Sequence, residues 1–482
     1  MRDKVKRSPA EGEFLFEIDE QPLEEAVTAW GGVPLLVRAV RSLGVPGSVK
    51  RHLHLKQRER GFDEATYIES FVVLNGVGGD CLEDFDQLRE DAGLAEMLGH
   101  AIPSAEAARK FLYQFHDAAK VEQAQRELPI DRVAYIPGES EPLQGLAAVN
   151  RDLIQELGRR CATEKIACVD LDATIIESWK REAKPTYEGI TGYQPVLGLW
   201  AEMNVVLADE FRDGNVPAQH ALLAVAKRAF QALPKTVEEF YFRGDSACEE
   251  DELLTWLRDD QRPDGPQGRI GFAVSARMNP ALHADILRIP QAHWQPYSED
   301  STATKECAEV VDYAPQQSPE NRDREPLRYV AIRIRKKQGE LFADGSAVKH
   351  FAVVSNLWDW PVKKLLQWHR EKAGSIEAAH DVIKNELAGG VMPSKYFGAN
   401  AAWLRLAVLT FNVLTALKRL ALPPELIAAR PKRLRFLIFT TPGRLVHHAR
   451  RKLLRLKRAW NRFGNWRGAF ALLPLPAQPA VT

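Results

Sequence analysis

Two aspartates lie two residues apart in an otherwise apolar segment, Ile166 to Ser178 (IACVDLDATIIES). The apolar and β-branched residues of this segment predict a strand. Because side chains alternate across a strand, Asp170 and Asp172 would point to the same face. An unpaired buried carboxylate is costly, so something cationic should lie against that face, and hard divalent ions such as Mg²⁺ bind carboxylate oxygens. The alternative interpretation is a strand end at the surface, with both aspartates solvated.

A third aspartate and a glutamate are the other acidic residues with a suggestive position. Asp245 directly follows a glycine, just after a strand predicted over 237–242. Sites in open α/β sheets gather beyond the carboxyl ends of strands, and the glycine lets the backbone turn there. Glu377 lies on a predicted helix and shares one face with Asp381 and Lys384. Such a triple usually means a solvated salt-bridge face, so these residues alone assign the helix no function.

The elements that would position these residues are strands and helices in alternation. Apart from the two strands above, the predicted strands are 194–202, 204–210 and the segments RIGFAVSARM, RYVAIRIRKK and KHFAVVSNLW. Helices are predicted at roughly 220–232, within 362–420, and throughout most of 1–155, where Ser104 is an expected N-cap. The chain is therefore expected to belong to the α/β class.

Composition and length indicate a soluble globular protein. The chain has 482 residues, 45% of them apolar and 27% charged, which is room for roughly two to four domains. Five cysteines without ligand spacing predict reduced thiols and a cytoplasmic protein, and the charged N-terminus lacks the apolar run of a signal peptide. The uncharged stretch from Leu406 to Leu417 falls short of the about 20 residues that span a bilayer. We therefore expect a buried helix there and no membrane partner.

Charge is unevenly distributed although the formal net charge is zero. The last 57 residues, 426–482, contain thirteen lysines and arginines and no acidic residue, which indicates a polyanionic partner. We favour DNA, and a membrane-surface amphipathic helix is the alternative. A second basic group suits a DNA-binding module between short helices, and an ordinary helical domain with a solvated basic face is the alternative there. This group comprises Lys50, Arg51, His52, His54, Lys56, Arg58 and Arg60.

The order of these features resembles a known family. Two strand-borne aspartates and a later helical glutamate, divided by a β-rich segment, are similar to bacterial DDE transposases with a ribonuclease H-like catalytic domain. More narrowly, the chain resembles the insertion sequence 1380 family, in the group with a Tyr-Arg-Glu-Lys signature. The segments that carry the resemblance are VDLDATIIES with YEGITGYQPVLGL, YFRGDSAC, REKAGSIEAAHDVIKNELAGG and FGANAAWLRLAVLTFNVL. Weaker similarity in GFDEATYIESFVVLNGVGGDCLEDFDQL and IPSAEAARKFL extends it over roughly residues 20–422.

The resemblance implies a fold and a division of the chain. The expected fold is a ribonuclease H-like mixed sheet flanked by helices, interrupted by a β-rich insertion and preceded by a helical DNA-binding domain. The implied regions are a helical N-terminal DNA-binding region (1–155), the first part of the catalytic core (156–250), the insertion (251–364), the helical second part of the core (365–425) and a basic C-terminal tail (426–482).

The resemblance also implies a catalytic triad. Matched residue by residue, the three catalytic and metal-binding carboxylates fall on Asp172, Asp245 and Glu377, with Asp170 as the rival for the first position. Two divalent ions about 4 Å apart would clamp the attacking and leaving oxygens of a phosphodiester. The expected cofactor is therefore a pair of Mg²⁺ ions, with Mn²⁺ as a substitute. No covalent protein–DNA intermediate is needed.

Two lysines are the expected phosphate contacts. Lys384 matches the signature lysine and would hold a phosphate as a point charge. Lys372 stands where the family has its arginine, with Trp368 or His369 in the aromatic position. This departure from the family pattern leaves the contacts to phosphate and to a flipped base open. It does not touch the triad.

The implied function is cut-and-paste DNA transposition. The protein would cleave DNA at the ends of an insertion sequence and transfer the strands into target DNA, as a homodimer at the nucleoid in the cytoplasm. Its partners would be double-stranded terminal inverted repeats and target DNA. Candidate residues for stacking on a flipped base are Trp294, Trp358 and Trp360, whose alternative role is core packing. The alternative functions are a catalytically inactive, transposase-derived DNA-binding protein and a general metal-dependent nuclease.

Overall fold

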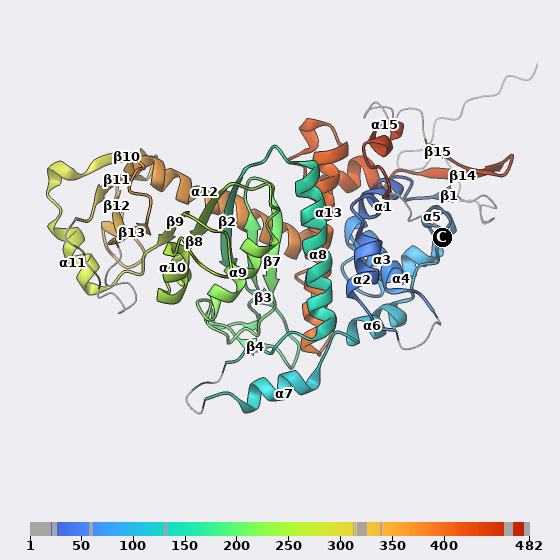
Figure 1. Ribbon diagram of the computed structural model, residues 1–482, viewed down its shortest axis with the longest axis horizontal. Coiled ribbons are helices and arrows are strands. Elements are labelled where there is room, and N and C mark those ends of the chain that lie inside the picture. Colours follow the sequence, from blue (N-terminus) through green and yellow to red (C-terminus); the bar gives the residue numbers. More distant parts are fainter. Residues whose placement is uncertain are drawn as a thin grey trace, which may run out of the picture.

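A nine-stranded mixed sheet, flanked by helices, extends from one end of the protein to its middle (Figure 1). The computed structural model describes residues 21, 27–56, 61–129, 132, 134–311, 313, 315, 325–337, 340–456 and 466–476. The strand order is β10-β11-β12-β13-β9-β8-β2-β6-β7. The expected α/β class is thereby confirmed as a large mixed sheet with helices.

Five of these strands form a unit around β2. They are β2 (Ile166–Ala173), β6 (Val196–Trp200), β7 (Val205–Glu210), β8 (Glu239–Gly244) and β9 (Ile270–Ser275). On one side of β2, the pairs β2–β6 and β6–β7 are antiparallel. On the other side, β2–β8 and β8–β9 are parallel. The central strand thus ends beside β8, so residues at the carboxyl ends of both strands are neighbours.

Four further strands extend the same sheet. They are β10 (Gln295–Glu299), β11 (Ala303–Glu309), β12 (Arg328–Lys336) and β13 (Val348–Ser355), of which β13 pairs antiparallel with β9. The β-rich residues therefore satisfy the open backbone groups at the edge of β9 instead of forming a separate sheet. The strand β9 lies inside the 251–364 region that was assigned to the insertion, yet it pairs with β8. Two helices also lie in this region, α10 (Asp251–Arg258) and α11 (Pro280–Arg288).

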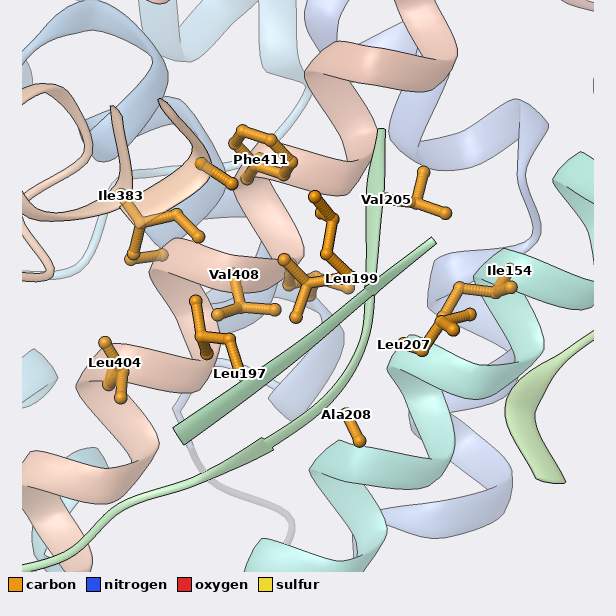
Figure 2. Close-up of a cluster of buried hydrophobic side chains, with 14 of the residues drawn as sticks. Ile154, Leu197, Leu199, Val205, Leu207, Ala208, Ile383, Leu404, Val408 and Phe411 are labelled. Carbon is orange, nitrogen blue, oxygen red and sulfur yellow. The ribbon is translucent and has the colours of Figure 1, made fainter. Parts of the chain in front are cut away.

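Helices cover both faces of the sheet. The helix α9 (Leu222–Ala232) packs on the face of β6 to which Gly198 points, where an added Cβ would lie 3.0 Å from Ala229. On the opposite face lie α12 (Val362–Glu386) and α13 (Phe397–Ala421). Figure 2 shows Leu197 and Leu199 of β6 among Leu404, Val408 and Phe411 of α13 and Ile383 of α12.

The apolar helix α13 lies between the sheet and the N-terminal helices. It is the one described helix that is long and apolar enough to cross a membrane, and its apolar window is wholly buried. It contacts β7, α8 (Glu141–Arg160) and the N-terminal helices α1 and α3. The expectation of a buried helix at this stretch is confirmed.

The N-terminal region is helical, as predicted. Its helices are α1 (Val33–Ser42), α2 (Val45–His52), α3 (Glu64–Val77), α4 (Asp84–Glu90), α5 (Ala92–Leu98), α6 (Ala105–Tyr113) and α7 (Ala118–Arg126). Ser104 is the N-cap of α6, since its hydroxyl accepts the Ala107 backbone N–H. Within the basic group, Arg51 and His52 both contact Asp152, and Arg58 and Arg60 lie outside the described residues.

The remaining elements are short. A small sheet contains β3 (Ile176–Glu177), β5 (Thr191–Tyr193) and β4 (Lys184–Pro185). A second one joins the two ends of the chain, because β1 (Val27–Thr28) pairs with β14 (Gly443–His448), which pairs with β15 (Arg451–Leu456). The short α14 (Pro431–Leu434) and α15 (Trp466–Ala471) complete the described elements near the C-terminus. All five cysteines are free thiols, as expected.

A buried carboxylate in the helical region gives stability a pH dependence. Glu69 of α3 accepts hydrogen bonds from Arg41 and from His100, whose Nε2 lies 3.0 Å from Oε1. Burial alone would raise the pKa of Glu69, but these two bonds outweigh it and the pKa is lowered. For His100, burial alone would lower the pKa, but the bond to Glu69 outweighs this effect and the pKa is raised.

We expect this pair to stabilise the fold most between about pH 4.5 and pH 6.5. The Glu69 contribution is present above its unfolded pKa and is lost as the pH falls. The His100 contribution is present below its unfolded pKa and is lost as the pH rises. Glu69→Gln should lower the free energy of unfolding by about 1–3 kcal/mol at pH 5.5 and by less at pH 8. Urea denaturation at both pH values measures this, and an equal loss at both would contradict it.

Candidate active site

Asp172 lies near the carboxyl end of the central strand, facing α12. It is opposite Leu197 in the β2–β6 register, and the Leu197 side chain points to the α12–α13 face. The Lys372 Nζ of α12 donates to Asp172 Oδ1 over 3.1 Å. The Nε2 of His380, eight residues further along α12, lies 3.7 Å from Asp172 Oδ2. Residues 200 positions apart in sequence therefore meet at this carboxylate.

The pKa of Asp172 reflects the other acidic groups nearby. Burial raises its pKa to about 6, and the charge of Lys372 opposes this rise. The negative charges of Asp245 and Glu377 add to it. Three carboxylates from β2, the end of β8 and α12 thus share one electrostatic neighbourhood. Clustered like charges of this kind are typical of sites that bind a cation.

Asp245 is held directly after β8. Its side chain accepts the Ala247 backbone N–H over 3.0 Å and so caps a short 3₁₀ helix, Ser246–Cys248. The preceding residue must be glycine, because a Cβ on Gly244 would lie 2.5 Å from the Cβ of Cys248. The Arg-Gly-Asp turn therefore fixes where this carboxylate points, as the sequence predicted for a strand end.

Glu377 is exposed on α12, and the triad is not closed around a single ion. Among the described residues, the group whose possible ligand atoms all lie within 4.8 Å of one another is Asp80, Cys81 and Asp84, which is remote from this site. The structure brings the three predicted carboxylates into one neighbourhood without tight convergence of their oxygens. Lys372, on the Asp172 carboxylate, supplies the positive charge in this arrangement.

Asp170 is committed to a different partner. It is fully buried, and its two oxygens accept from Arg243 Nε and Nη2 over 2.7 and 3.0 Å. The Ser375 hydroxyl also donates to Oδ2. The cation expected against this face is therefore, at Asp170, the guanidinium of Arg243. This arrangement favours Asp172, whose side chain is 15% exposed, over its fully buried rival.

The two predicted phosphate-binding lysines are both engaged with the protein. Lys384 Nζ donates to the Ile175 carbonyl over 2.6 Å and lies 3.3 Å from Thr174 Oγ1, so it holds the segment after β2. Lys372 is buried, which lowers its pKa, but the charges of Asp172 and Asp245 outweigh this and the pKa is raised. Lys372 is thus a counter-ion inside the carboxylate cluster.

The neighbourhood of the carboxylates is open to large ligands. Two hollows adjoin there, with volumes of about 570 and 800 Å³. Asp245 and Tyr187 line both of them. Lys384 lines the first and Arg277 the second. An extended polymer would fit this surface better than a small enclosed substrate.

Sequence reasoning missed two exposed aromatic residues, of which Tyr187 lines both hollows. Trp179 and Tyr187 lie next to the strands of the small sheet, with 90% and 76% of their surface exposed. The carboxylates Asp245 and Asp172 help to raise the pKa of Tyr187, after its burial and Glu188. The signal was present in the segment SWKREAKPTYEG, where aromatic and basic residues interleave as in single-stranded nucleic-acid sites.

The insertion tryptophans are less available than the sequence suggested. Trp294 is buried under Arg333, whose guanidinium lies 4.1 Å from its ring centre. Trp360 packs against Tyr241 and Trp368. Trp358 is 49% exposed and is the one of the three that could meet a ligand. Core packing, the alternative role, therefore applies to Trp294 and largely to Trp360.

His380 is another residue beside Asp172 that the sequence did not assign to the site. It belongs to an apolar helix stripe with Ile376, Ile383 and Leu387, all of which are buried. Neither of its ring nitrogens has a hydrogen-bond partner among the described residues. Burial, with the charges of Lys372 and Lys384, lowers its pKa to about 3, so the imidazole beside Asp172 is neutral.

Comparisons with known proteins show the family to which the chain belongs. The family described as "Transposase DDE domain group 1" matches residues 24–473, and the chain belongs to that family. DNA transposition is the activity of this class, and divalent metal ions are its general cofactors. The chain is also similar in structure to a piggyBac transposase, solved by cryo-EM as a synaptic complex with hairpin DNA. That likeness has a TM-score of 0.42 and 11% sequence identity, and covers 80% of this chain and 74% of the other. No curated protein sequence matches the chain.

Proposed function

We propose that this protein cleaves DNA at the ends of an insertion sequence and joins those ends to target DNA, in cut-and-paste transposition. The observation that carries the proposal is the position of Asp172 on β2. It lies beside the end of β8, which Asp245 follows, and against α12, which carries Glu377. The strand order β7-β6-β2-β8-β9, antiparallel and then parallel, supports a ribonuclease H-like core. Membership of the insertion sequence 1380 family, with double-stranded terminal repeats and target DNA as partners of a homodimer, is part of the proposal.

The donor set suits a hard divalent cation. Asp172, Asp245 and Glu377 would hold it, because carboxylate oxygens are the ligands that Mg²⁺ prefers, and Mn²⁺ would substitute. When bound, such ions supply Lewis-acid activation of the phosphodiester and of the attacking oxygen. The position of the Lys372 ammonium on Asp172 marks where this cluster requires positive charge.

The chain itself orients the reacting groups. The Arg243–Asp170 pair anchors β2 to β8 and to α12, where Arg243 also donates to the Trp368 carbonyl. Lys384 ties α12 to the segment after β2. These two ties lie on either side of the carboxylates along α12. They set the distance of Glu377 from the two aspartates, which is the geometry that the reaction depends on.

The direct test is nicking of DNA that carries the element ends, in the presence of Mg²⁺. A transposase should cleave at the terminal repeats and leave a scrambled duplex intact. Equal cleavage of both duplexes would support the general nuclease instead. Binding of the repeats without cleavage by the wild-type protein would support the inactive, DNA-binding alternative.

We expect Trp179 to stack on unpaired bases at a DNA end in this site. Because stacking contributes about 1–3 kcal/mol per base, Trp179→Ala should weaken binding of a frayed end roughly tenfold and binding of a fully paired end much less. Fluorescence anisotropy with the two duplexes measures this. Trp179→Phe is the matched control, since it keeps an aromatic ring and should retain most of the difference between the two duplexes. Equal weakening for both duplexes would contradict the expectation.

A further inference from the structure

The C-terminal basic residues form a two-stranded β-ribbon. The strands β14 and β15 pair antiparallel over six residue pairs, from Gly443–Leu456 to His448–Arg451. The turn at the tip consists of Ala449 and Arg450, which have positive φ angles of 48° and 63°. In Figure 1 the ribbon projects away from the N-terminal helices. The sequence had left open whether these residues were ordered or formed an amphipathic helix.

One face of the ribbon is attached to the protein. Leu445 on this face is buried and lies beside Gly93 of α5. Next to it, Glu96 of α5 pairs with His447 over 2.7 Å and with Lys452 over 3.2 Å. These contacts fix the orientation of the ribbon relative to the helical region. They leave the opposite face turned outward.

The outward face is strongly basic. Because side chains alternate, it carries the opposed pairs Arg444–Arg455, Val446–Leu453 and His448–Arg451. Basic residues directly opposite each other destabilise a strand pair. Arg450, Arg451 and Arg455 form no ion pair with any residue that the structure describes. An external polyanion bound at Arg450, Arg451 and Arg455 would offset the positive charge of this face.

The turn adds to this pattern. Two-residue hairpin turns with both φ angles positive usually contain asparagine and glycine, because other residues are strained there. The arginine at the second position is therefore an unfavourable choice for the fold alone. Arg450 stands at the tip, next to the His448–Arg451 pair that ends the basic face. Backbone strain at such a position motivates a functional interpretation.

We propose that the outward face of the β14–β15 ribbon docks on duplex DNA, at a distance from the carboxylates. A two-stranded ribbon fits the major groove, about 12 Å wide, and arginine guanidiniums bind phosphates through two parallel hydrogen bonds. The choice of DNA as the anion rests on the proposed function. The ribbon is a second contact region, which would bind the DNA that the catalytic site cleaves.

The test measures the salt dependence of DNA binding by the full chain. Asp245→Asn protein without divalent metal is used as the background, so that cleavage does not interfere. Neutralising Arg450, Arg451 and Arg455 together with alanine should reduce the slope of log K against log salt by about 0.9 per lost phosphate contact, or roughly 2–3 in total. At 50 mM salt the same variant should bind an element-end duplex about a hundredfold more weakly. Replacing the three arginines with lysine should retain the slope.

The matched control neutralises three exposed arginines elsewhere: Arg159, Arg269 and Arg288. Its salt slope should equal that of the parent protein, and the thermal unfolding of both triple variants should be similar to the parent. An unchanged slope in the ribbon variant would overturn the proposal. Loss of binding to anionic lipid vesicles with DNA binding intact would also overturn it, in favour of a membrane surface.

The ribbon and the catalytic proposal fail separately. If wild-type protein does not nick the element ends but binding depends on the three arginines, the catalytic proposal fails and the ribbon stands. If nicking occurs and the ribbon variant binds DNA with an unchanged slope, the ribbon proposal fails and the catalytic one stands.

Discussion

Asp245→Asn is expected to abolish Mg²⁺-dependent nicking of DNA that carries the element ends. The substitution keeps the size of the side chain and its ability to cap the following turn, but removes the charge that a divalent cation requires. Metal-assisted charge stabilisation is worth several kcal/mol, so the rate should fall by a factor of roughly 10³ or more. Asp172→Asn and Glu377→Gln should have effects of the same size. Nicking rates under single-turnover conditions measure all three.

Asp381→Asn is the matched control for these variants. Asp381 lies one turn after Glu377 on α12 and pairs with Arg430, so its loss should leave the nicking rate near that of the wild type. DNA binding should persist in every variant, which separates catalysis from folding. Nicking by Asp245→Asn at the wild-type rate would show that the site is assigned wrongly.

The second large effect is on stability. Asp170→Asn should lower the free energy of unfolding by about 3–5 kcal/mol, because it removes the buried counter-charge of Arg243 and leaves only the exposed Glu371. Replacing both residues with apolar side chains of similar volume should restore much of the loss. Urea denaturation at neutral pH measures both variants.

Asp172→Asn is the internal comparison on the same strand. Burial and neighbouring carboxylates raise the pKa of Asp172, and Asp245 would remain as a counter-charge for Lys372. This substitution should therefore destabilise the metal-free protein much less than Asp170→Asn. Asp170 would therefore affect folding and Asp172 catalysis. The reverse result, a stable but inactive Asp170→Asn and an unfolded Asp172→Asn, would exchange their roles.

Local patterns predicted the elements that carry the carboxylates. β6, β7 and β8 lie within two residues of their predicted positions, and β2 begins at the first residue of its predicted segment, because β-branched residues and alternation mark them. β2 ends at Ala173, before the predicted segment does. The strands β10 and β11 were missed, since they are polar and charged along most of their length. Their pairing with β12 decides their structure, and a local pattern does not report such a partner.

The candidate site shows the same division. The sequence placed Asp172, Asp245 and Glu377 at the ends or on the faces of suitable elements. The structure brings these elements together but does not close the carboxylates around one ion. It could not show that Arg243 would neutralise Asp170, because the two residues meet only through the parallel pairing of β2 with β8. It also could not separate Lys384 as a tie to Ile175 from Lys384 as a free phosphate ligand. Both depend on distances between residues remote in sequence.

The pairing of β1 with β14 has a consequence for damaged gene copies. A frameshift after the codon for Leu426 would leave all three carboxylates encoded, yet its product would lack the partner of β1. It would also lack Arg435, whose guanidinium binds the Asn75 and Gly76 carbonyls at the end of α3. The N-terminal helices would then lose these contacts with the C-terminal segment. A census of intact copies in a genome that checks only the acidic triad would thus count some that encode no stable protein.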